Sequence, residues 1–289
     1  MGIKGLNYFL KRNCKDAIKK EHLRFLKGKS IAVDTSIYLY KFKMESSILA
    51  GMFTMCSLFK YYNITPIFVF DGKPPVEKEA ALNERRIKKD LAESKYNALK
   101  KELETCDKND KASIEKKLKI LKKQFIRIKN SDVRLVKKLF RYYGIQYVEC
   151  EGEADQGCRE LCQEKKVYAC LSEDMDMFAL GCPRVLRYFS LLNHTVVIYD
   201  LKYILLCLNM NFTQFQNLCY LSSTDYHRSP RTVAYYYNRL LYEDVNFTIP
   251  ILNTKIKINI HVMQEKELHE LLKEHYFLSP KISILINSN

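Results

Sequence analysis

The feature that most constrains the fold is a set of short, continuous apolar runs that each end close to a carboxylate. Residues 29–33 form a β-branched run that ends at Asp34, and residues 67–70 are wholly apolar and end at Asp71. A third run, residues 167–171, leads into Ser-Glu-Asp-Met-Asp. Strands buried on both faces have this unbroken apolar character, and they occur in parallel sheets covered by helices. The sequence therefore predicts an α/β fold with a mostly parallel sheet.

Helical segments separate these runs, as parallel strands require. Residues 47–62 predict a helix with Ile48, Met52, Met55 and Phe59 on its apolar face. Further helices are predicted at 131–143, 153–165, 201–208, 212–221, 231–242 and 264–275. Further strands are predicted at 145–148, 185–189 and 195–199, the last two as a hairpin, and residues 247–262 are β-prone.

Residues 76–130 differ in composition from the rest of the chain. They are rich in Lys, Glu, Leu and Ala and contain no Gly or Pro, which predicts two helices, about 77–105 and 110–128, that break at residues 107–110. Residues 73–138 carry 21 basic and 11 acidic side chains, which accounts for two-thirds of the net charge of +15. Such a concentration of positive charge favours an anionic partner such as nucleic acid. A solvated helical hairpin with incidental lysines is the alternative.

Composition excludes several other classes. No run of about 18 apolar residues occurs, so we expect no membrane-spanning helix. The first residues lack the apolar stretch of a signal peptide, and Leu6 stands where myristoylation requires Ser or Thr. The ten cysteines include no Cys-x-x-Cys pair and show no zinc-ligand spacing with the six histidines. We therefore expect reduced thiols, mostly in the core, and an intracellular, reducing compartment.

Seven carboxylates from four regions of the chain are candidates for one site. They are Asp34, Asp71, Glu151, Glu153, Asp174, Asp176 and Asp225. Sites in open α/β sheets form at the carboxyl ends of the strands, where packed carboxylates would repel one another unless divalent cations bind. Hard oxygen ligands suit Mg²⁺, and two ions roughly 4 Å apart serve in-line phosphodiester hydrolysis. Taken singly, an Asp after a strand is often a helix N-cap or turn residue instead.

Six motifs surround these carboxylates. They are Met-Gly-Ile-Lys-Gly-Leu at the start, Ala-Val-Asp-Thr-Ser, Val-Phe-Asp-Gly-Lys-Pro-Pro, Glu-Gly-Glu-Ala-Asp, Ser-Glu-Asp-Met-Asp and Ser-Thr-Asp-Tyr. In order and spacing they resemble the flap endonuclease/XPG family of structure-specific 5′ nucleases, over residues 1 to about 226. The resemblance implies an α/β fold with a PIN-like, mostly parallel sheet, helices on both faces, a basic helical arch insertion and a small C-terminal helical region. It implies a nuclease core at 1–226, divided into 1–75, the arch at 76–130 and 131–226, before a divergent region at 227–289.

The resemblance also assigns roles to residues. The seven carboxylates would hold two Mg²⁺ ions, with Mn²⁺ as a substitute. Lys78, and either Arg85 or Arg86, match basic residues at the base of the arch that contact the scissile phosphate, and a shorter spacer leaves that choice open. Tyr40 matches an aromatic on which a base stacks, although a core tyrosine is an equal alternative. Gly2 fits an N-terminus held beside the active site.

The remaining DNA contacts are expected from basic side chains, namely Lys73, Lys116, Lys117, Lys122, Lys123, Arg228 and Arg231. The chain departs from the family after Asp225. No glycine follows Gly181, which excludes the family's Gly-x-Gly turn that holds K⁺ and a DNA phosphate. His227, Arg228 and Arg231 are candidates to hold phosphate instead, and a plain surface loop is the alternative. No sliding-clamp motif is found.

The function implied by the resemblance is a metal-dependent 5′ flap endonuclease and 5′–3′ exonuclease. We expect a monomer that acts on branched or nicked DNA with a free 5′ end in replication, repair or recombination, with no membrane partner. The nucleus, or a cytoplasmic replication site if the source is viral, is the expected location. The alternatives are a non-catalytic DNA-binding scaffold and, within the superfamily, a Holliday-junction resolvase or a 5′–3′ exoribonuclease.

Overall fold

The structure is a computed structural model that describes residues 2–45, 47–75, 78–105, 108–222, 229–241 and 256–275. In these residues one sheet has the strand order β1–β7–β6–β5–β2–β3–β4–β8. The strands are β1 (Ile18–His22), β2 (Ser30–Asp34), β3 (Thr65–Phe70), β4 (Gln146–Glu149), β5 (Ala169–Leu171), β6 (Arg184–Ser190), β7 (Thr195–Asp200) and β8 (Ile258–Asn259). The five strands from β6 to β4 are parallel, and the edge pairings β1–β7, β6–β7 and β4–β8 are antiparallel. The predicted parallel sheet and the β6–β7 hairpin are confirmed.

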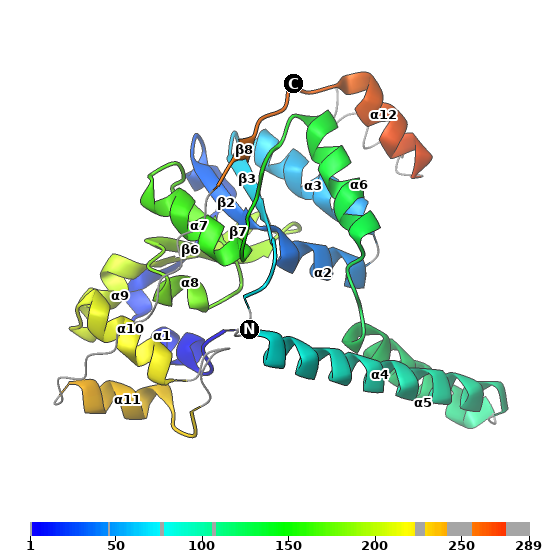
Figure 1. The fold of residues 1–289 in the computed structure, drawn as a ribbon, viewed down its shortest axis with the longest axis horizontal. Coiled ribbons are helices and arrows are strands. Elements are labelled where there is room, and N and C mark those ends of the chain that lie inside the picture. Colours follow the sequence, from blue (N-terminus) through cyan, green and yellow to red (C-terminus); the bar gives the residue numbers. More distant parts are fainter. Residues whose placement is uncertain are drawn as a thin grey trace.

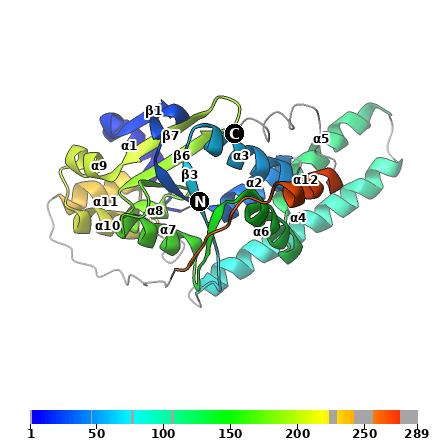
Figure 2. The ribbon, with the colours of Figure 1, turned by 90° about the horizontal axis from the view of Figure 1, so that it is seen from above.

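Helices cover both faces of the sheet (Figures 1 and 2). One face carries α2 (Thr35–Glu45), α3 (Ile48–Tyr61), α6 (Asn130–Tyr143) and α12 (Glu265–Glu274). The other carries α1 (Leu6–Asn13), α7 (Ala154–Gln163), α8 (Asp176–Ala179), α9 (Leu201–Leu208), α10 (Phe212–Leu221) and α11 (Val233–Leu240).

The apolar runs are unbroken because each strand is buried on both sides. In β3, Phe68 and Phe70 pack toward α3 and α6, whereas Ile67 and Val69 pack toward the α7 side. Burying one such side chain contributes about 1.5–3 kcal/mol relative to leaving it exposed. The two cores therefore fix the position of each strand end and of the residue that follows it.

The basic insertion is a long antiparallel hairpin of α4 (Glu79–Thr105) and α5 (Lys108–Gln124) that projects from the body (Figures 1 and 2). A thin apolar seam of Ala92, Ile114 and Leu118 is buried between the two helices. Lys, Arg, Asp and Glu side chains make up most of the exposed surface of the hairpin, and Ile87, Leu91 and Ile120 are exposed among them. The two helices lie where the sequence predicted them. The structure begins α5 two residues before the predicted start, and part of the predicted break lies outside the described residues.

The last described segment, residues 256–275, adds one strand and one helix to the same sheet. Tyr147 in β4 pairs with Asn259 in β8, and α12 buries Leu268, Leu271 and Leu272 against the α3–α6 face. Only Ile258–Asn259 of the predicted β-prone stretch forms a strand in the described residues. The sequence did not predict β1, because Ile-Lys-Lys-Glu-His is a mostly polar edge strand. None of the described helices is both long and apolar enough to cross a bilayer.

Candidate active site

Asp34 and Asp71 stand at the carboxyl ends of neighbouring parallel strands. Asp34 is the last residue of β2 and is 8% exposed; its Oδ2 accepts a hydrogen bond from the Ser172 hydroxyl at 3.0 Å. Asp71 directly follows β3, and its carboxylate accepts bonds from the Ser36 hydroxyl and, at 2.8 Å, from the backbone N–H of Ala154. Donors from neighbouring elements thus orient both carboxylates.

The segment after β5 is ordered by a chain of short-range hydrogen bonds. The backbone N–H of Asp174 donates to the Ser172 hydroxyl at 3.1 Å, and the N–H of Asp176 donates to Asp174 Oδ1 at 3.0 Å. Asp176 then begins α8 and is 9% exposed. The sequence Ser-Glu-Asp-Met-Asp therefore folds into a compact turn that holds two carboxylates beside Asp34.

Backbone hydrogen bonds join the loop after β3 to the loop between β4 and α7, which carries Glu151 and Glu153. The N–H of Gly72 donates to the Gly152 carbonyl at 2.6 Å, and the N–H of Lys73 donates to the Glu151 carbonyl at 3.0 Å. A Cβ on Gly72 would collide with the backbone at Cys150 and Glu151, so only glycine allows this approach. The contact positions Glu153, the N-cap residue of α7, at the edge of the sheet that holds Asp71.

Six side chains make up what we call the carboxylate cluster: Asp34, Asp71, Glu153, Asp155, Asp174 and Asp176. Burial and the charge of Asp71 raise the pKa of Asp34 to about 8. Burial and the charge of Glu153 raise the pKa of Asp155 to about 7. Both shifts show that negative charge is concentrated in a poorly solvated region, where a bound cation would favour the ionised forms.

The donors present suit a hard divalent cation. All six groups offer carboxylate oxygens, which are the ligands that Mg²⁺ prefers. In the part of the chain that the structure describes, no three of these carboxylate oxygens lie within 4.8 Å of one another.

Gly2 packs directly against the cluster. Its φ of +80° lies in the left-handed region, which favours glycine. A Cβ built on Gly2 would collide with Asp174 Oδ1 and would lie 2.9 Å from Asp176 Oδ1. Gly2 therefore lies beside these two carboxylates.

The base of the arch contacts the site through Lys78, which immediately precedes α4. Lys78 is 8% exposed, and its Nζ lies 2.7 Å from Glu153 Oε2. Farther along, the Nζ of Lys89 lies 4.8 Å from the centre of the Tyr40 ring. Arg85 and Arg86 are both exposed in α4, and at 3.6 residues per turn they lie about 40° and about 60° around the helix from Lys89.

Tyr40 is exposed, at 37%, so it does not belong to the core. Glu151 and Lys73 have exposed side chains on the loops at the rim of the cluster. Arg231 is exposed just before α11, and its guanidinium carbon lies 5.1 Å from the Tyr235 ring centre. The remaining predicted arch contacts, Arg86, Lys116, Lys117, Lys122 and Lys123, are all exposed. Asp225, His227 and Arg228 lie outside the described residues.

Three residues of the site were not predicted from the sequence. Ser36 donates a hydrogen bond to Asp71, and Ser172 donates one to Asp34. Asp155 shares the low-dielectric region with Glu153 and Asp174. Asp155 follows Glu153 by two residues within the Glu-Gly-Glu-Ala-Asp motif, so the spacing carried a signal. The sequence carried no such signal for Ser36 and Ser172, because serines close to an aspartate are common at turns.

Comparison with known proteins identifies two family regions in this chain. Residues 1–92 match the XPG N-terminal domain, and residues 144–225 match the XPG I-region. Flap endonuclease 1 of Candida tropicalis is 33% identical over 253 residues, which cover 81% of this chain and 65% of that protein. Flap endonuclease 1 of Zea mays is 35% identical over 245 residues, covering 78% of this chain and 62% of that protein. The chain thus matches slightly less than two-thirds of the length of these relatives.

Solved structures show the same fold. The catalytic core of Rad2 in complex with a DNA substrate superposes with a TM-score of 0.68 at 17% identity, covering 99% of this chain and 98% of that one. Flap endonuclease-1 from Methanococcus jannaschii gives a TM-score of 0.63 at 21% identity, covering 94% and 95%. Human GEN1 in complex with Holliday junction DNA gives 0.60 at 21% identity, covering 83% and 55%.

Proposed function

The chain belongs to the flap endonuclease/XPG family, and on that premise we propose that it is a metal-dependent, structure-specific 5′ nuclease acting on DNA. The reaction is hydrolysis of a phosphodiester bond near a free 5′ end, as a flap endonuclease and 5′–3′ exonuclease. The family membership and the relatives named flap endonuclease 1 support the reaction class. The substrate, the pathway and the metal are proposals.

One observation carries this proposal: an ion pair joins the carboxylate cluster to the base of the basic arch. Lys78, near the start of the arch insertion, pairs with Glu153 of the cluster at 2.7 Å, so the positive and negative regions meet at this contact. A phosphodiester drawn in by the arch would arrive next to oxygen ligands for divalent cations. A non-catalytic DNA-binding scaffold has no use for such a cluster of partly buried carboxylates.

The cluster suits two Mg²⁺ ions, with Mn²⁺ as a substitute, held by Asp34, Asp71, Glu153, Asp174 and Asp176, with Asp155 and Glu151 nearby. When bound, such ions supply a nucleophilic hydroxide and stabilise charge on the phosphate. The residues of the chain do the positioning. Ser36 and Ser172 orient the two strand-end aspartates, and Gly2 leaves room for Asp174 and Asp176 to keep their positions.

The face of α4 supplies the contacts to the scissile phosphate. We propose that Arg85, which lies four residues before Lys89 and so about one turn from it, makes the phosphate contact rather than Arg86. Tyr40, exposed beside Lys89, offers a ring on which a nucleobase can stack, and such stacking is worth about 1–3 kcal/mol per base. Asp225 and Arg228 keep their proposed roles as a metal ligand and a phosphate contact.

Cleavage of a 5′-labelled double-flap DNA tests the function. We expect cutting at the base of the flap with Mg²⁺ and none with EDTA. Cutting of nicked and single-stranded DNA without preference for the flap would indicate an exonuclease without a duplex anchor. Tight binding that is equal in Mg²⁺ and EDTA, with no cutting of DNA or of a matching RNA, would support a scaffold and contradict the proposal.

A pair of neighbouring substitutions makes this test specific. Asp174→Asn keeps the shape of the turn and removes one charge of the cluster, and we expect it to abolish cleavage while DNA binding remains. Glu173→Gln alters the adjacent residue, which pairs with Arg187 at 3.5 Å instead of joining the cluster, and should retain cleavage. Equal activity of the two variants would contradict the site.

A further inference from the structure

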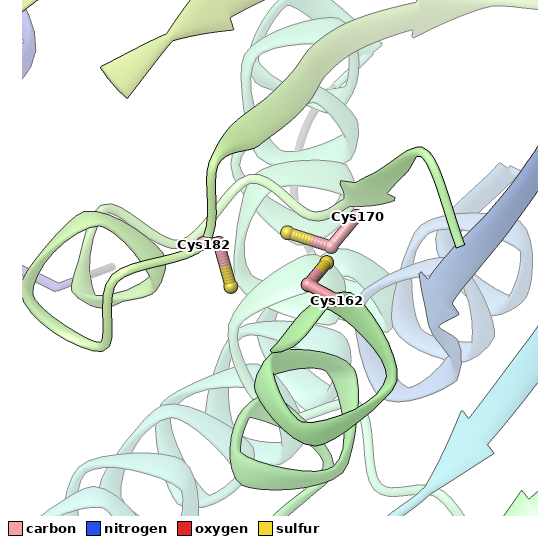
Figure 3. Close-up of side chains that lie close together, drawn as sticks. All are labelled: Cys162, Cys170 and Cys182. Carbon is pink, nitrogen blue, oxygen red and sulfur yellow. The ribbon is translucent and has the colours of Figure 1, made fainter. Parts of the chain in front are cut away.

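Three cysteines that are far apart in the sequence converge inside the core (Figure 3). Cys162 lies near the end of α7, Cys170 lies in β5, and Cys182 follows α8. All three are buried, and their sulfur atoms lie within 4.8 Å of one another. Figure 3 shows the three side chains pointing toward a common space between the elements. We refer to these residues as the thiol cluster.

The dimensions of the thiol cluster fit a single metal ion. Zinc–sulfur bonds of about 2.3 Å in a tetrahedral site place ligand sulfurs about 3.8 Å apart. The sulfurs therefore need to move by about 1 Å or less to bind one ion. The Sγ of Cys182 also lies 3.9 Å from the thioether sulfur of Met177, which provides a further soft donor at the edge of the cluster.

Metal binding would replace the protons of the thiol cluster. The Cys170 thiol donates to the Arg184 carbonyl at 3.6 Å, and the Cys182 thiol donates to Met177 Sδ at 3.9 Å. Interactions among the three thiols, together with burial, raise the pKa of Cys170 and Cys182, whereas the neighbouring thiols lower the pKa of Cys162. The Arg184 guanidinium, which pairs with Asp200 at 3.1 Å, also lowers the pKa of Cys162. Buried negative charge on sulfur is costly without a balancing cation, and a metal ion provides one while displacing the thiol protons.

We propose that Cys162, Cys170 and Cys182 bind one thiophilic metal ion, Zn²⁺ or Cu⁺, through their sulfur atoms. Thiolate ligands select these soft ions over Mg²⁺, so the site is chemically distinct from the carboxylate cluster. A cavity of about 870 Å³ is lined by Gln163, Gly181 and Pro183, which are the chain neighbours of Cys162 and Cys182.

The bound ion has a structural role. It joins the end of α7, the middle of β5 and the loop after α8. The same three segments carry carboxylates of the other site: Glu153 caps the start of α7, Asp174 follows β5, and Asp176 begins α8. The metal thus fixes the segments that carry the carboxylate cluster without contacting its side chains. Loss of the metal should lower the thermal stability of the protein, and this effect can be measured without an activity assay.

Binding can be measured without nuclease activity. The full-length, reduced, metal-free protein is titrated anaerobically with Co²⁺, as a spectroscopic probe for Zn²⁺, and separately with Cu⁺, in excess Mg²⁺. We expect thiolate-to-metal charge-transfer absorption that saturates at one ion per chain, with a rise in the unfolding temperature. Competition between Zn²⁺ and Cu⁺, followed by elemental analysis, shows which ion is preferred.

Substitutions locate the site. Cys162→Ser, Cys170→Ser and Cys182→Ser should each weaken binding at least tenfold. Cys56→Ser, which alters a buried thiol in the opposite core, and Asp174→Asn should leave the titration unchanged. Absence of stoichiometric charge-transfer absorption in the unsubstituted protein would overturn the proposal even if a serine variant fails to fold. Undiminished binding by folded Cys162→Ser would also overturn it.

Discussion

Single atoms decide how closely the site can assemble. Gly2 and Gly72 each occupy a place where one additional carbon would collide, in one case with carboxylate oxygens and in the other with backbone carbonyls. Ser36 and Ser172 each hold one strand-end aspartate. The geometry of the candidate site therefore depends on small residues as much as on the charged ones.

Replacing Gly2 separates this packing from backbone strain. Gly2→Ala should lower kcat on the order of 100-fold, because the added methyl displaces Asp174 and Asp176. Gly28→Ala is the matched control, since Gly28 has a similar φ of +73° but no atom within 4 Å of the added carbon. Both variants should lose about 1 kcal/mol of stability from left-handed strain. Normal kcat in Gly2→Ala, measured on flap DNA, would contradict the packing described.

Asp34 makes stability depend on pH when metal is absent. Its folded pKa is raised from 3.8 to about 8, so the folded state holds a proton that the unfolded state releases above about pH 4. Stability is therefore lost as pH rises through this window. In EDTA, we expect Asp34→Asn to gain stability over the unsubstituted protein between pH 5 and pH 9, as followed by urea unfolding. A stability difference that does not change with pH would show that Asp34 is ionised throughout.

At the scale of elements, the regular geometry of α4 sets the angles between its basic side chains. Its start is fixed by the Lys78–Glu153 ion pair, and its third turn by the contact of Lys89 with Tyr40. Arg127, which follows α5, pairs with Asp90 at 2.6 Å and with Glu93 at 2.7 Å, and so joins the two helices of the hairpin. The Lys78 and Lys89 contacts join the hairpin to the body of the protein.

This geometry distinguishes two adjacent arginines. Arg85→Ala should lower kcat about 100-fold with little change in KM, because a phosphate contact that strengthens in the transition state is lost. Arg86→Ala, one residue away on a different face of α4, should remain within about threefold of normal. Single-turnover cleavage of flap DNA measures both variants. The reverse order of effects would place the phosphate on the other face of α4.

The outer surface of the arch should govern binding and not chemistry. Reversing the charge of Lys116, Lys117, Lys122 and Lys123 should weaken flap binding and lower the salt dependence, by up to about 3 on a log–log scale. The control reverses four exposed lysines near β1 and so reaches the same net charge: Lys15, Lys19, Lys20 and Lys27. If both sets change affinity equally, only overall charge matters. Short unbranched substrates should still be cut by the arch variant.

At the scale of the molecule, the sequence predicted the parts whose signal is local. Apolar runs with a following aspartate identified β2 and β3, and uninterrupted Lys/Glu/Leu/Ala composition identified α4 and α5. It did not predict β1, which is polar and gains its stability from pairing with β7. It also did not predict the thiol cluster, because spacings of eight and twelve residues bring cysteines together only after α7, β5 and α8 have packed.

The sheet order also determines when this protein can finish folding during its synthesis. β1, at residues 18–22, pairs with β7, at residues 195–200, and β4 pairs with β8, at residues 258–259. The first strand to leave the ribosome must therefore wait for a partner made more than 170 residues later. Pairings over such distances form slowly and leave strand edges exposed in the meantime. The lysines of β1 protect the edge of this strand until β7 has been made, because charged side chains oppose edge-to-edge aggregation of nascent chains.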